Sequence, residues 1–268
     1  MGQILSLEPT GGLLALIVFA LVFASAVAGL ALQSRLPERL TTGGSRDMSG
    51  AVVGLITLLL ALVLGLLIWT AFGVYSTQKA SIQTLAVNVL KVDNALHDYG
   101  DEASQGRTLL RDLARRAIDH VWHADKEVVV GYVHALSGGE QLQHYLDGLQ
   151  PSTDKQKAAK ADAQAAAAAL VQTRLTMALG LNDPVSYPLL ALVMTWAMAL
   201  FFGYGFLSKA TPTAFAMAAV GALAIASAIY AIDDLSSPYT GMFQISPQPI
   251  RDVLTVVDAL ASRAGGQH

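Results

Sequence analysis

The sequence predicts an all-α membrane protein with four transmembrane helices in two hairpins and a long helical extramembrane insert between spans two and three. Three observations lead to this fold class. Charged residues make up 14% of the 268 residues, whereas about 25% is usual in a soluble domain. The deficit lies at the two ends of the chain, and residues 75–184 between them have an ordinary soluble composition. Each end contains two uncharged apolar runs, each long enough to cross roughly 30 Å of hydrocarbon.

The apolar runs give the expected spans, at about residues 11–33, 50–74, 186–207 and 213–232. The first ten residues contain no Lys or Arg, unlike the basic start of a signal peptide, so the first span is expected to remain as an anchor. The expected domains are an N-terminal transmembrane hairpin (1–74), an extramembrane helical bundle (75–184), a C-terminal transmembrane hairpin (185–233) and a Pro/Gly loop with a short amphipathic helix (234–268).

Small residues recur at four-residue spacing within the spans. Examples are Ser25 with Gly29, Gly50 with Gly54, and Ala61 with Gly65. Small side chains let helix backbones approach closely in lipid. The spacing therefore indicates packed helices, in contacts either within the chain or between subunits.

The second span is expected to continue out of the membrane as one helix of nearly fifty residues. No Pro or Gly interrupts residues 75–99, and Gly100 is expected to end the helix. The apolar residues Leu85, Val89, Val92 and Leu96 repeat at helical spacing. Further helices are expected at about residues 102–123 and 152–179, the latter with Ser152 as its N-cap. The residues between them are expected to be less regular.

A polar series on the long helix shares the period of the apolar one. It consists of Thr70, Gly73, Thr77, Ser81, Thr84, Asn88 and Lys91. Spacings of three and four residues place the series on one helix face. A polar stripe that crosses the membrane boundary is suited to line an aqueous path in an oligomer, and a ring of lysines at its mouth would favour anions. The same pattern also fits the solvent face of an amphipathic helix, or a contact between helices.

The fourth span runs into two adjacent aspartates, Asp233 and Asp234. Negative charge at a helix C-terminus opposes the macrodipole, so a partner is expected. The candidate partners are Arg251, Arg35 and Arg39. We interpret the acids as a structural clasp that holds the following loop, or the arginine-bearing first loop, at the membrane edge. A charged ring flanking an ion path and a proton- or substrate-coupling site are the alternatives.

Two segments resemble the bestrophin-like family, a domain of unknown function in bacterial integral membrane proteins. The first carries the family pattern at residues 64–67, Thr77, Gln78, Asn88, Asp93, Leu96, Tyr99 and Gly100. The second carries it at Asp233 or Asp234, Pro238, Tyr239, Thr240, Gly241, Ile245, Ser246, Pro249, Ile250 and Arg251. The chain departs from the pattern by inserting residues 235–237 and by having Tyr-Thr where Phe-Ser is usual.

The resemblance implies four spans with a helical extramembrane part, in the inner membrane of a bacterium. Bestrophins are oligomeric anion channels, so it also implies a homo-oligomer that passes small ions, with a pentamer favoured by analogy. The acidic calcium clasp of calcium-gated bestrophins has no counterpart in this sequence.

Several functional classes find no support in the sequence. The chain has no cysteine, which excludes disulfides and Cys-based zinc sites. Its net charge of −3 and lack of a basic run argue against nucleic acid as a partner. No phosphate-binding glycine loop or H-E-x-x-H motif occurs, so neither an enzyme nor a cofactor is expected. His120 and His123 are weak metal candidates, because no third ligand accompanies them.

The sequence thus predicts an oligomeric ion channel with a slight preference for small anions, conducting along the polar series of the long helix. Its expected partners are the lipid bilayer, further copies of itself and small ions. The alternative is a non-conducting scaffold, or a sensory or regulatory subunit, that uses the helical bundle to dock partners.

Overall fold

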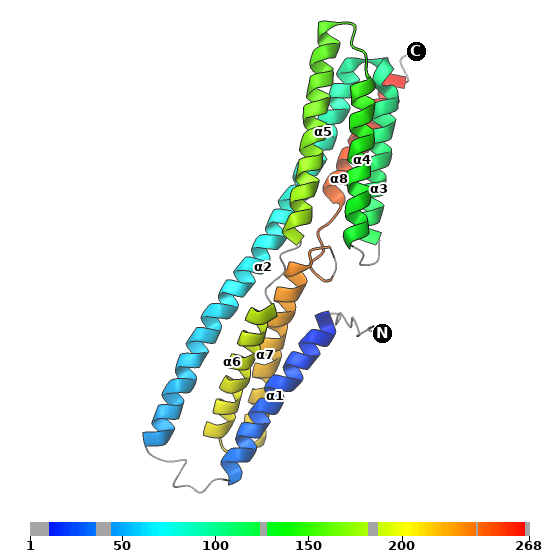
Figure 1. Ribbon diagram of the computed structural model, residues 1–268. Helices are drawn as coiled ribbons and strands as arrows, with labels where there is room; N and C mark the ends of the chain where they lie inside the picture. The colour runs from blue at the N-terminus through cyan, green and yellow to red at the C-terminus, as the bar shows by residue number, and fades with distance from the viewer. Residues whose placement is uncertain (1–10, 36–43, 124–127, 182–186, 240, 266–268) are drawn as a thin grey trace, which may run out of the picture. The chain divides into compact units, whose positions relative to one another are not determined.

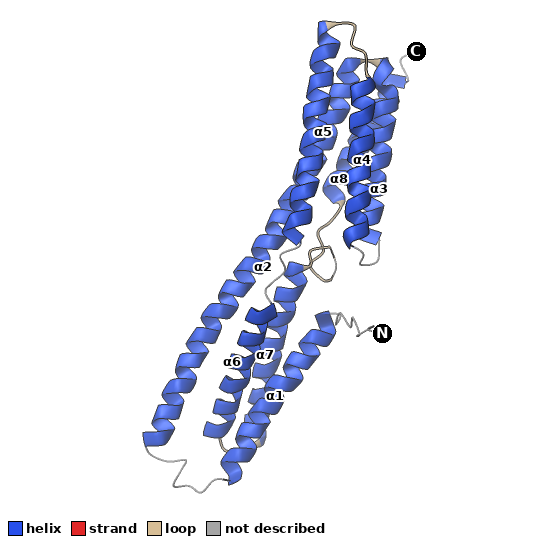
Figure 2. Ribbon diagram, in the orientation of Figure 1, coloured by secondary structure: helices blue, strands red, loops and turns tan. Residues whose placement is uncertain are grey.

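The computed structural model describes residues 11–35, 44–123, 128–181, 187–239 and 241–265 (Figure 1). These residues form helices joined by loops and contain no strand (Figure 2). Four helices are long and apolar enough to span a membrane: α1 (Gly11–Arg35), α2 (Gly44–Tyr99), α6 (Tyr187–Leu207) and α7 (Pro212–Ser236). The four predicted spans are confirmed, whereas their grouping into two hairpins stays a prediction.

The chain forms two compact units. The first comprises Met1–Val74 with Asp183–Phe243, and the second comprises Tyr75–Asn182 with Gln244–His268. In the first unit α1 packs along α6 and α7 (Figure 1). The core of this unit includes Val18 and Val22 of α1, Val193 of α6 and Ile229 of α7. Burial of apolar side chains from all four spans therefore defines this unit.

The contact between α1 and α6 depends on small residues. A Cβ atom on Gly29 would meet the Phe202 carbonyl oxygen, and one on Gly205 would meet the Ala26 carbonyl oxygen. Ser25 Oγ donates to the Met198 carbonyl oxygen at 2.7 Å. The Ser25 and Gly29 pair thus serves a contact within the chain. By contrast, no described atom lies within 4 Å of a Cβ built on Gly50, Gly54 or Gly65.

The second unit is a helical bundle. It contains residues 75–99 of α2, together with η2 (Asp101–Ala103), α3 (Ser104–His123), α4 (Val128–Gly148), α5 (Asp154–Leu181) and α8 (Gln248–Gly265). The expected long helix is confirmed, since α2 runs unbroken for 56 residues. It ends at Tyr99, and the next residue, Gly100, has a φ of +116°, which suits a residue without a side chain.

The bundle departs from the prediction in two places. Residues 128–148, expected to be less regular, form the continuous helix α4. A Cβ on Gly139 would lie 2.7 Å from Val171 Cγ2, so close packing holds this helix despite the poor helix propensity of glycine. The N-cap of α5 is also displaced by one residue, because Thr153 Oγ1, and not the hydroxyl of Ser152, accepts the Gln156 N–H at 3.2 Å.

The last helix, α8, lies on the bundle. Its apolar residues Ile250, Leu254 and Val257 are buried. Asp258 accepts a hydrogen bond from Arg115 Nη2 on α3 at 2.9 Å. The amphipathic pattern at the end of the sequence is therefore explained by packing within the second unit.

Candidate functional site

The polar series on α2, here called the seam, lies beside the buried stripe of that helix. The buried stripe is Val53, Leu60, Leu67, Ala71, Gln78, Ile82, Leu85, Val89, Val92, Leu96 and Tyr99. Apart from Gly73, every seam residue directly precedes a member of this stripe. One residue is about 100° around an α-helix. The seam therefore follows the margin of the packed face from Thr70 to Lys91.

Most of the seam lies on the surface of the subunit. Thr70, Gly73, Thr77, Thr84 and Lys91 are exposed, and Ser81 is half-buried. Toward the start of α2 the same face becomes apolar. There the exposed large side chains include Leu55, Leu59 and Leu66. The polar part of the face is thus confined to the end of the span and the beginning of the bundle.

The hydroxyl groups of Thr70, Ser81 and Thr84 bond back to their own helix. Thr70 Oγ1 donates to the Leu67 carbonyl oxygen at 2.9 Å, and Ser81 Oγ donates to that of Thr77 at 2.9 Å. Thr84 Oγ1 donates to the Ala80 carbonyl oxygen at 3.0 Å. Each of these three hydroxyl groups therefore already donates its proton within the helix. Their oxygen lone pairs can still accept hydrogen bonds from water.

Asn88 does not share this exposure. Its side chain is only 6% exposed, so it lies inside the second unit and does not line a surface. Asn88, which was predicted to line the path with the other seam residues, therefore differs from them in its exposure within the subunit. The reason is that α2 runs within the bundle at this level, where Val89 faces Leu110 and Leu142 across a small cavity. The exposed seam therefore extends from Thr70 to Thr84 and resumes at Lys91.

A buried ion pair involves Asp93, five residues beyond Asn88 on α2. Asp93 is fully buried and accepts two hydrogen bonds from Arg107, Nε to Oδ1 at 2.9 Å and Nη2 to Oδ2 at 2.8 Å. The hydrogen bond to Asp93 raises the pKa of Arg107 above its ordinary value. Sequence reasoning named Asp93 only through the family pattern and did not identify Arg107. Nothing in the sequence marks Arg107 out from the other arginines of α3.

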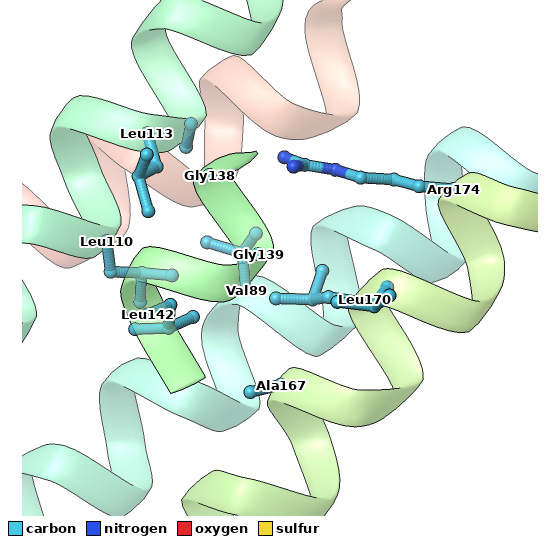
Figure 3. Close-up of a pocket in the computed structure, with 11 residues that line it drawn as sticks. Val89, Leu110, Leu113, Gly138, Gly139, Leu142, Ala167, Leu170 and Arg174 are labelled. Carbon is cyan, nitrogen blue, oxygen red and sulfur yellow. The ribbon is translucent and has the colours of Figure 1, made fainter. Parts of the chain in front are cut away.

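The small cavity in the bundle has an apolar lining and one charged member (Figure 3). Its volume is about 20 Å³, which is room for about one water molecule. Arg174 extends toward it from α5, and burial lowers the pKa of this guanidinium. The cavity is too small for an organic ligand, so we assign it to the packing of the bundle.

Asp234 holds the loop that follows α7. Its Oδ1 accepts the Met242 N–H at 2.9 Å, and its Oδ2 accepts the Phe243 N–H at 2.8 Å. The side chain is 6% exposed. Two main-chain N–H groups thus bind this carboxylate, for which the sequence suggested an arginine.

The neighbouring acid faces another element. A Cβ on Gly11, the first residue of α1, would lie 3.0 Å from Asp233 Oδ2. The positive end of a helix dipole favours a carboxylate there. Of the suggested arginine partners, Arg35 is exposed in the last turn of α1 and Arg251 is exposed on α8. Arg39 lies outside the described residues.

The structure offers no metal centre among the residues it describes. No group of three His, Asp or Glu side chains there is placed to hold an ion. His120 and His123 belong to α3, but their side chains lie outside the described part of the chain.

Comparison with known proteins gives a family match and a fold match. A model of the Bestrophin-like domain matches residues 20–250. Two structures of a bacterial bestrophin homologue from Klebsiella pneumoniae, each with one point mutation, have TM-scores of 0.66 and 0.63. Both are 10% identical to this chain and cover 92% and 94% of it, over 98% and 99% of their own length.

A further structure, of a mutated membrane protein, is 11% identical with a TM-score of 0.63, covering 94% of this chain and 99% of its own. At such identities the likeness shows the fold alone. No curated protein matches the sequence.

Proposed function

Because this chain belongs to the bestrophin-like family, we propose that it is an ion channel of the bacterial inner membrane, formed by several copies of the chain around a path along the exposed seam of α2. A pentamer is the favoured assembly by analogy with bestrophins. The chain is not an enzyme and needs no cofactor in this proposal.

One observation carries the proposal. A single unbroken helix bears a polar, exposed face that begins within the predicted span at Thr70 and continues beyond it to Thr84. Polar groups inside a span usually face a bundle interior or water and not lipid. Several copies of α2 with this face turned inward would provide a polar lining across the membrane boundary.

Lys91 supplies the selectivity in this proposal. It is the one charged residue of the seam and is exposed. A ring of ammonium groups at the mouth of a path raises the local concentration of anions. Small anions are therefore preferred, and the preference is modest because the hydroxyl oxygens further along the path act as acceptors.

Asp234 serves as a structural clasp in the same proposal. Its two bonds to Met242 and Phe243 fix the loop after α7, with Met242 78% exposed. The clasp stabilises the C-terminal end of α7 and takes no direct part in conduction.

The test is the reversal potential of the purified protein in a planar bilayer under asymmetric KCl. Wild type is compared with Lys91→Glu, and Lys79→Glu is the matched control. Lys79 is also exposed on α2 but lies about 120° away around the helix. The expected result is an anion-selective current whose selectivity weakens or inverts in Lys91→Glu and is unchanged in Lys79→Glu.

Two results would contradict the proposal. Equal anion selectivity in all three proteins would show that the ion path does not follow the seam. No current from a well-folded oligomer would favour the non-conducting scaffold that docks partners through its bundle.

A further inference from the structure

The first unit contains a cavity of about 330 Å³ between the second half of α1, the end of α6 and the first turns of α7. Half of its lining residues are Ala or Gly. These are Ala26, Gly205, Ala214, Ala218 and Gly221. Gly205 and Gly221 are closely packed, against the backbone of α1 and the ring of Phe201 respectively, and the short side chains of Ala26, Ala214 and Ala218 complete the lining. Tyr204 and Met217 also line the cavity and are exposed. The cavity therefore opens onto the outer surface of the spans.

The lining of this cavity favours neither bound water nor an empty state. A buried water molecule needs two to four polar partners. The polar side chains in the lining are Ser208 and Tyr204, and the hydroxyl of Tyr204 already bonds Thr57 Oγ1 at 3.0 Å. An empty cavity forgoes the dispersion contacts of its whole lining. The medium around membrane-spanning helices is hydrocarbon, so a lipid acyl chain is the occupant that the lining fits.

The end of the cavity near the α6–α7 loop carries positive charge. Arg46 Nη2 donates to the Leu207 carbonyl oxygen at 3.2 Å, which places the guanidinium next to Ser208 in the lining. Lys209 follows directly and is exposed. Basic groups beside a crevice between spans bind the phosphate of anionic lipids.

From these observations we propose that this cavity binds an anionic phospholipid, with one acyl chain between α1, α6 and α7 and its phosphate at Arg46 and Lys209. The site does not depend on conduction. It lies among the spans of a single subunit and would be occupied in a channel and in a scaffold alike.

The test is lipid retention by the full chain in native mass spectrometry. The protein in detergent is exposed to equal amounts of phosphatidylglycerol and phosphatidylcholine with identical chains. Wild type is expected to retain phosphatidylglycerol preferentially. Lys209→Gln should reduce that preference by about fivefold, the effect of one basic residue near an anionic headgroup.

Filling the cavity tests the acyl chain separately. Ala218→Leu places a larger side chain in the lining and should reduce retention of both lipids. Ala214→Leu fills the same space from the first turn of α7 if Ala218→Leu does not fold. The control is Ala224→Leu, an exposed alanine of α7 outside the cavity, which should retain lipid like wild type.

Equal retention of both lipids by wild type would overturn the headgroup assignment. Retention that survives both cavity-filling substitutions would show lipid bound elsewhere on the protein and would overturn the site.

Discussion

The carboxylate of Asp234 occupies the space that a side chain on Gly241 would need. A Cβ built on Gly241 would overlap Asp234 Oδ1, and the residue has a φ of +93°. The chain must therefore turn in the left-handed region at Gly241 to bring the next two N–H groups onto the carboxylate. The acidic helix end and the glycine of the loop thus form one structural feature.

Substituting Gly241→Ala tests this relationship. The left-handed backbone costs about 1–2 kcal/mol for a residue with a Cβ. Displacing the carboxylate also weakens hydrogen bonds to a charged group, which contribute about 1.5–3 kcal/mol each. We expect a clearly lower melting temperature by circular dichroism in detergent, with faster hydrogen exchange at Met242 and Phe243. Gly12→Ala, at a helical glycine with open space around it, should melt like wild type.

The buried pair of Asp93 and Arg107 gives a second prediction. Removing one partner of a buried pair leaves an uncompensated charge and costs about 3–5 kcal/mol. Asp93→Leu alone should therefore destabilise the bundle strongly. The double substitution Asp93→Leu with Arg107→Met should recover most of the loss, because neither charge then remains buried.

Thermal unfolding of the two single variants and the double variant measures this coupling. The surface pair Asp154–Lys157 is the matched control, since Asp154 is 98% exposed. Asp154→Asn should cost no more than about 1 kcal/mol, because it removes only an exposed ion pair and a charge at a helix N-terminus. Additive losses in the Asp93 and Arg107 variants would refute the coupling.

The crossing of α1 and α6 leads to a third prediction. A Cβ on Gly205 would meet the Ala26 carbonyl oxygen and lie 2.9 Å from the Leu30 nitrogen, both backbone atoms that cannot rotate away. Gly205→Ala should force the helices apart and destabilise the protein by about 1–3 kcal/mol. Gly65→Ala, in the open on α2, should not lower the melting temperature. A stable Gly205→Ala variant would show that the two helices can separate freely.

The elements that could be predicted from the sequence are those whose pattern lies within a short stretch of chain. The length and apolarity of the spans, the spacing of residues 85–96 and the position of Gly100 each reside in a short stretch of chain. The helix α4 was expected to be less regular, and it contains Gly138 and Gly139, which have poor helix propensity, although Gly139 is needed for the approach of Val171. Its regularity arises from packing, which the local sequence does not encode.

The candidate site was only partly predictable for the same reason. Asn88 has the same helical period as Thr84 and Lys91, so the sequence gives no reason to separate them. Their exposure differs because other helices cover α2 at residue 88 and not at residues 84 and 91. The partner of Asp93 likewise lies on another helix, and the N–H groups that bind Asp234 carry no side-chain signature at all.

The last prediction uses the absence of cysteine from the chain. Single cysteines can be introduced without removing any native thiol. Thr77→Cys and Thr84→Cys should react with a water-soluble, positively charged thiol reagent, because both side chains are exposed. Asn88→Cys should resist it, because that side chain is buried.

The effect of labelling on current separates a path from an ordinary solvent face. Positive charge attached at Thr77 or Thr84 should change conductance or raise anion selectivity. Gln83 is the control, since it is exposed on α2 but lies about 100° from Thr84. Gln83→Cys should be labelled with no change in current. Labelling at Thr77 and Thr84 that is equally silent would identify the seam as a solvated helix face, and the ion path would then have to lie on another surface of the subunit.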